Sequence, residues 1–114
     1  MHVLLERLPG PLLIPATVVP EVCLMLERRR GTDAELAFLS DMRAGRYTLI
    51  ESVSADLERI AELVAKYDDL PLGTVDASVI ALAERLNITT VVTIDRRDFG
   101  IVRPAHVPAL TLLP

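Results

Sequence analysis

The sequence has 114 residues, 51% hydrophobic and 25% charged, which is enough apolar material for one folded domain and excludes a disordered tail. The formal net charge of −4 argues against a broad basic surface that coats nucleic acid, so any nucleic-acid contact should be local. A single cysteine, Cys23, excludes an internal disulfide framework and a cysteine-based zinc site, as suits a reducing cytoplasm. Prolines interrupt the apolar runs before any reaches the roughly 18 residues of a membrane span, so we expect a cytoplasmic protein without membrane contact.

The first half of the chain alternates between helical and strand-like patterns. Residues 4–8 carry three leucines at helical spacing before a Pro-Gly pair, which predicts an opening helix. Residues 12–14 form a short apolar run between prolines, typical of a strand covered on both faces. An early proline and three final arginines before a glycine delimit a helix over residues 20–30. A Thr-x-x-Glu capping box predicts a further helix over 32–44, and residues 47–50 are β-prone.

The second half continues the alternation. Residues 54–67 place apolar side chains at the helical period, and after a loop residues 75–87 do so again. Residues 90–94 are a β-branched run, and residues 110–113 favour a last short strand. Short apolar strands that alternate with helices predict an α/β domain with a mainly parallel sheet and right-handed crossovers. In such sheets ligands bind beyond the carboxyl ends of the strands.

Three carboxylates are expected at that edge: Glu21 and Asp76 in first helical turns, and Asp95 at the end of a strand. Each has a structural explanation on its own, because first-turn acids interact favourably with the helix dipole and Asp is common in turns. Together they suggest a cation, since two carboxylates ~5 Å apart repel by about 3 kcal/mol at an effective dielectric constant of ~20. Oxygen-only ligation at an open edge favours Mg²⁺ or Mn²⁺, which can activate water for phosphodiester cleavage.

The segments that carry these acids resemble a known family. Residues 18–22 (VVPEV), 70–79 (LPLGTVDASV) and 93–99 (TIDRRDF) are similar to the successive motifs of PIN domains, especially of VapC-type toxins from bacterial toxin–antitoxin systems. The resemblance implies a three-layer α/β/α fold and a metal-dependent endoribonuclease, an enzyme that cleaves RNA with metal-activated water. The acids that match Glu21, Asp76 and Asp95 bind Mg²⁺ or Mn²⁺ in that family. An RNA substrate, a cognate antitoxin protein and a homodimer are the expected partners.

Four neighbours of these acids are candidate supporting residues. Thr93 matches a hydroxyl position beside the site of the family. Asp98 has two readings, as a peripheral metal carboxylate or as an exposed turn acid. Arg96 and Arg97 suit contact with an RNA phosphate, and a solvated pair is an equally good interpretation.

The sequence departs from the family pattern at its start. PIN domains begin with a central strand that carries the first metal-binding Asp, whereas this chain has no Asp before Asp33 and a predicted helix where that strand would lie. Glu6 is not carried over, because it falls within the predicted helix. We therefore expect residues 1–114 to form one PIN-like domain, N-terminally truncated and with the first strand missing.

Loss of a central strand would cost an amount comparable with a whole domain's ~5 to 15 kcal/mol of stability. We expect much less nuclease activity than in a full-length relative. The alternative is a catalytically impaired remnant that acts as a dimerisation or antitoxin-binding module. A third hypothesis, the receiver domain of two-component signalling, is disfavoured because it needs a lysine after a late strand, whereas Lys66 lies in a predicted helix.

Overall fold

The structure is a computed structural model that describes residues 3–6, 12–70, 72–88, 90–93 and 111–113 of the chain, with side chains in 12–70 and 72–88. Among these residues, five strands form a sheet in the order β3-β2-β1-β4-β5. The strands are β1 (Val3–Glu6), β2 (Leu12–Pro15), β3 (Tyr47–Ile50), β4 (Thr90–Thr93) and β5 (Thr111–Leu113).

The sheet is mainly parallel, as the sequence predicts. Strand β2 pairs with β3 in parallel, and β4 pairs with β5 in parallel. Strand β1 pairs antiparallel with both β2 and β4, so the other four strands all run in one direction and β1 alone runs against them. The carboxyl ends of these four parallel strands therefore share one edge of the sheet.

The prediction of an opening helix is wrong. Residues Val3–Glu6 form a strand, and this strand occupies the centre of the sheet, where the sequence analysis expected a missing strand. Leu5 is paired with Leu13 on one side and with Val91 on the other. Ladder hydrogen bonds to two flanking strands outweigh the weak helical preference of three leucines, since propensity is only a prior that tertiary contacts override.

The direction of β1 also decides where Glu6 lies. Glu6 is paired with Leu12, the first residue of β2, and with Thr90, the first residue of β4. Glu6 therefore sits at the amino edge of the parallel strands, opposite the edge where the acidic site is expected. The reason that the sequence suggested for leaving out Glu6, a position within a helix, is wrong, because Glu6 is the last residue of β1.

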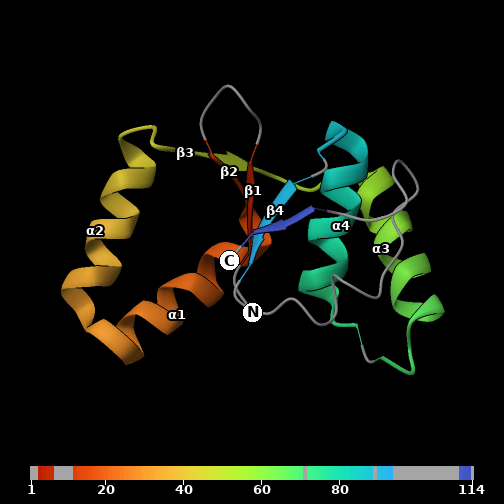
Figure 1. Cartoon of the computed structure of the whole chain (residues 1–114), viewed down its shortest axis with the longest axis horizontal. Coiled ribbons are helices and arrows are strands. Elements are labelled where there is room, and N and C mark those ends of the chain that lie inside the picture. The colour runs from red at the N-terminus through yellow and green to blue at the C-terminus, as the bar shows by residue number, and fades with distance from the viewer. Residues whose placement is uncertain (1–2, 7–11, 71, 89, 94–110, 114) are drawn as a thin grey trace.

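The helices cover the sheet on two sides, with α1 and α2 on one and α3 and α4 on the other (Figure 1). The predicted three-layer α/β/α arrangement is thus confirmed. The helical elements are η1 (Ala16–Val18), α1 (Val19–Arg30), α2 (Thr32–Arg43), α3 (Ser54–Lys66) and α4 (Thr74–Leu86).

Local sequence signals account for several helix ends. Helix α1 has Pro20 in its first turn and ends at Gly31, whose φ of 90° is strained for any residue with a side chain. Helix α4 ends at Asn87 in the left-handed region, at φ 54°. The capping box predicted at Thr32 does not form: Gly31 takes the N-cap position, and no side chain caps α2.

The core lies between the sheet and α4. Seven consecutive residues of α4, from Ala77 to Ala83, are buried, whereas α2 has no buried residue. The largest fully buried side chains outside α4 are Ile14, Val18 and Leu63. The middle of α4 is therefore fixed by packing, and the half-buried Asp76 lies directly before this buried stretch.

Candidate metal centre at the carboxyl edge of the sheet

Glu21 lies where the sequence predicts, in the first turn of α1, just beyond the carboxyl end of β2. Its side chain is half-buried, and its Oε2 atom is fully buried with no hydrogen-bond partner among the described residues. Buried polar atoms are nearly always hydrogen-bonded, and an unpaired one costs free energy. An uncompensated carboxylate oxygen in such a place is suited to a cation.

Asp76 lies in the first turn of α4 and is half-buried. Helix α4 ends at Leu86, and β4 begins at Thr90, so the carboxyl end of α4 faces the amino edge of the sheet. Thirteen helical residues span about 20 Å at 1.5 Å per residue, which returns the first turn of α4 to the carboxyl edge. Asp76 also makes a polar or electrostatic contact within the protein.

A hydrogen bond joins the segments that carry these two acids. Thr17 Oγ1 and Ser78 Oγ are 2.7 Å apart, although 61 residues separate them in the chain. Thr17 belongs to η1, which leads into α1, and Ser78 lies in α4, two residues after Asp76. The fold therefore brings the approach to Glu21 and the start of α4 together, as the sequence analysis expects of an edge site.

The rest of the predicted site is described only in part. Asp95, Arg96, Arg97 and Asp98 lie outside the described residues. Thr93 ends β4 at the carboxyl edge, where its backbone is paired with Val3 of β1. Within residues 12–70 and 72–88, no three His, Cys, Asp or Glu side chains come together as a metal-binding group.

Thr17 and Ser78 belong to no sequence pattern that marks them as candidate site residues. Small hydroxyl residues are common in helices and turns, and the sequence gives no signal that two of them meet across 61 positions. The only local hint is the place of Ser78 two residues after an acid already under consideration. A tertiary contact of this kind becomes visible only once the strand order is known.

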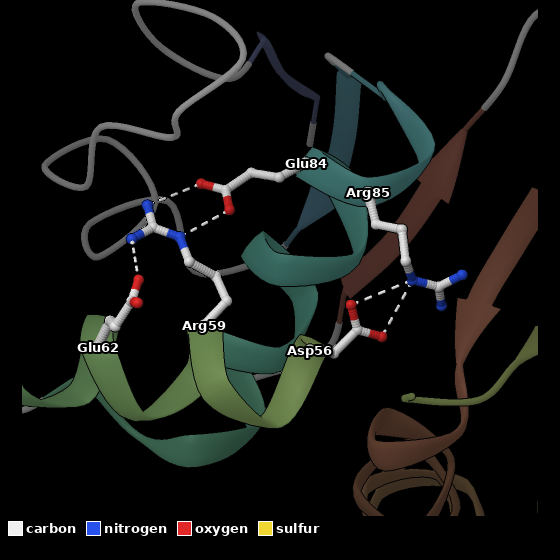
Figure 2. Close-up of polar contacts among 5 residues, drawn as sticks. All are labelled: Asp56, Arg59, Glu62, Glu84 and Arg85. Carbon is white, nitrogen blue, oxygen red and sulfur yellow. Dashed lines mark hydrogen bonds and ion pairs between the residues drawn. The ribbon is translucent and has the colours of Figure 1, made fainter. Parts of the chain in front are cut away.

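Polar contacts between α3 and α4 hold the far part of α4 (Figure 2). The Arg59 guanidinium donates to both carboxylate oxygens of Glu84, over 2.8 Å to Oε1 and 2.9 Å to Oε2. Hydrogen bonding to Glu84 raises the pKa of Arg59 above its usual range, so this guanidinium stays charged. Asp56, only 3% exposed, accepts from Arg85 Nε at 3.1 Å and caps α3 through the Val53 N–H at 2.9 Å. These contacts anchor α4 without taking part in the edge site.

Comparison with known proteins agrees with the resemblance. A model of the PIN domain family matches residues 2–103, and the chain therefore belongs to the PIN domain family. It is 36% identical to Ribonuclease VapC26 of Mycobacterium tuberculosis over 103 residues, which are 90% of this chain and 76% of that protein.

The fold has a solved counterpart. The crystal structure of Mycobacterium tuberculosis VapC20, a sarcin-ricin loop cleaving toxin, matches with a TM-score of 0.59 at 22% identity. The match covers 68% of this chain, and the chain spans 60% of the length of that structure. No helix in the described part of the chain is long and apolar enough to cross a membrane.

Proposed function

We propose that this protein is a divalent-cation-dependent endoribonuclease of the VapC toxin type, in which Glu21, Asp76 and Asp95 hold Mg²⁺ or Mn²⁺. The observation that carries the proposal is the buried Oε2 atom of Glu21, which has no hydrogen-bond partner among the described residues. Family membership and the 36% identity to a ribonuclease support the reaction class. The carboxylate donors fit Mg²⁺ or Mn²⁺, which prefer oxygen ligands.

In this proposal the acidic residues at the carboxyl edge of the sheet bind the cation, and residues beside them contact the RNA. A bound divalent cation would supply activation of water and stabilisation of the leaving oxygen. Glu21 and Asp76 lie in the first turns of two helices that start at this edge. Arg96 and Arg97 contact RNA phosphate, while Thr93 and Asp98 support the acidic site.

The wider assignment follows the same family. We propose that residues 1–114 act as one PIN-like domain, with RNA as substrate and a cognate antitoxin protein as partner. We also propose a homodimer, which the resemblance to VapC-type toxins implies, and a cytoplasmic location, which the single cysteine supports. The RNA sequence that is cleaved depends on loop shape and single-stranded segments.

One observation favours the second candidate function, a catalytically impaired module that dimerises or binds an antitoxin. Strand β1 is central, yet its only acid, Glu6, lies at the amino edge of the parallel strands. Strand β1 thus brings no carboxylate to the carboxyl edge. Cation affinity would then depend on the acids of α1, α4 and the segment after β4.

The test is thermal unfolding with and without Mn²⁺, on the wild-type chain and the Asp76→Asn variant, followed by cleavage of total cellular RNA with and without a chelator. Mn²⁺ at ~100 times its dissociation constant should stabilise the wild type by about 2.7 kcal/mol. Asp68→Asn, which changes an exposed loop acid, is the matched control. Equal Mn²⁺ shifts in wild type and Asp76→Asn would contradict the proposed metal centre. An Asp76-dependent shift without chelator-sensitive cleavage would favour the impaired module.

A further inference from the structure

The hydroxyls of Thr17 and Ser78 form a hydrogen-bond chain whose direction can be deduced. Ser78 Oγ lies within hydrogen-bond distance of both Thr17 Oγ1 and the carbonyl oxygen of Val75. A carbonyl oxygen only accepts, so the single hydroxyl proton of Ser78 goes to Val75. Thr17 must then be the donor to Ser78. The chain therefore runs from the Thr17 hydroxyl through Ser78 to the Val75 carbonyl.

This hydrogen-bond chain connects the two segments that carry the acids. Val75 precedes Asp76 directly, so the accepting carbonyl belongs to the peptide unit that leads into Asp76. At the other end, Thr17 lies in η1, the short turn between β2 and the first turn of α1 that holds Glu21. The side chains of Thr17 and Ser78 thus link η1 to the first turn of α4.

The Ser78 end of this link is shielded from water. Ser78 is fully buried, and so are Ala77 and Val79 on either side of it and Val18 next to Thr17, whereas Thr17 itself is half-buried. A hydrogen bond shielded from water in this way is stronger than one at a fully exposed position. The Glu21 Oε2 atom, buried and without a hydrogen-bond partner among the described residues, makes no comparable link of its own.

We propose that Thr17 and Ser78 are positioning residues, which set the separation of Glu21 and Asp76 and thereby the affinity for the divalent cation. The proposal rests on the metal centre put forward above. Partners that orient metal ligands from outside the coordination shell typically contribute about 10- to 100-fold to metal affinity. Removal of the Thr17 donor should therefore weaken Mn²⁺ binding about tenfold or more.

The test compares Thr17→Val, Thr17→Ser and the wild type by Mn²⁺ titration, with free Mn²⁺ measured by electron paramagnetic resonance. Thr17→Val keeps the shape of the side chain and removes the donor, while Ser78 keeps its bond to Val75. Thr17→Ser keeps the hydroxyl and should restore wild-type affinity. Thr48→Val, a change of an exposed threonine in β3, is the matched control. Ser78→Ala removes the acceptor instead and should weaken Mn²⁺ binding in the same way.

The metal-free melting temperature separates positioning from general stability. We expect Thr17→Val to lose Mn²⁺ affinity while its metal-free melting temperature stays within about 5 °C of the wild type. Unchanged Mn²⁺ affinity in Thr17→Val and Ser78→Ala, with Asp76-dependent binding in the wild type, would overturn the positioning role alone. So would a loss of cooperative melting in both variants, which would show a purely structural role. Wild-type binding that does not depend on Asp76 would instead overturn the metal centre itself.

Discussion

Arg59 on α3 and Glu84 on α4 form a bidentate ion pair, with donor–acceptor distances of 2.8 and 2.9 Å. The side chains are 28% and 12% exposed, so water screens this pair less than a surface pair. Arg59 also contacts Glu62 at 3.1 Å, but that partner is 56% exposed. The two carboxylates that share Arg59 should therefore differ in their contribution to stability.

Glu84→Gln keeps the length of the side chain and removes its charge, so one strong charge-assisted interaction is lost. We expect the free energy of unfolding to fall by roughly 1 to 2 kcal/mol, as measured by urea denaturation. Glu62→Gln, on the exposed side of the same arginine, should change it by less than about 0.5 kcal/mol. Equal losses of unfolding free energy in the two variants would show that the Arg59–Glu84 pair contributes no more to stability than the exposed Arg59–Glu62 contact.

Glu21→Gln tests whether the half-buried Glu21 carboxylate, whose Oε2 atom is buried, destabilises the metal-free protein. A neutral amide is cheaper to bury than a charge, so the metal-free melting temperature should rise by a few degrees, on the order of 0.5 to 1 kcal/mol. The stabilisation by Mn²⁺ should disappear at the same time. Glu27→Gln, an exposed position on the same helix, is the control and should change neither quantity. A lower metal-free melting temperature in Glu21→Gln would refute this account.

Leu5→Pro tests the central position of β1. Leu5 is paired with residues on both flanking strands, so a proline there removes a ladder donor and forces the backbone away from a partner. We expect a loss of about 3 kcal/mol or more, seen as a much lower or absent cooperative transition by circular dichroism. Leu5→Val, which keeps the N–H and favours strands, should retain cooperative melting. A stable Leu5→Pro variant would show that β1 is dispensable.

Cys23 should react slowly with alkylating reagents in the metal-free protein. Burial, and secondarily the nearby Glu35 carboxylate, raises the pKa of the Cys23 thiol above its usual 9.0. The thiolate is the reactive form, so a raised pKa lowers the reactive fraction at pH 8, and the rate should climb as pH rises through 9 and beyond. The same chain unfolded in urea should react several-fold faster at pH 8. Equal rates in the two states would contradict this expectation.

The sequence predicted those parts of the fold that depend on a few adjacent residues. Pro20 and Gly31 bound α1, and Asn87 ends α4, because each acts through its own backbone conformation. Thr32 shows where local reasoning fails. Its pattern fits a capping box, but Gly31 at φ 90° already occupies the N-cap position.

Features that join distant segments could not be predicted. Three leucines in residues 4–8 fit a helix as well as a buried strand, and a four-residue strand is too short to show its own period. Only the pairing of β1 with β2 and β4 decides between them. At the site, Glu21 and Asp76 were located from their first-turn positions, whereas the Thr17–Ser78 contact depends on how η1 meets α4.

The place of β1 has a consequence for synthesis on the ribosome. One edge of β1 meets β2 a few residues later in the chain, while its other edge meets β4, whose residues Thr90–Thr93 are translated far later. Translation proceeds at ~5 to 20 residues per second, so the edge of β1 that pairs with β4 stays unpaired for several seconds. Throughout this interval the nascent chain presents an unpaired strand edge to other chains and to chaperones. Slower translation of the segment before β4 should therefore increase aggregation of the newly made protein.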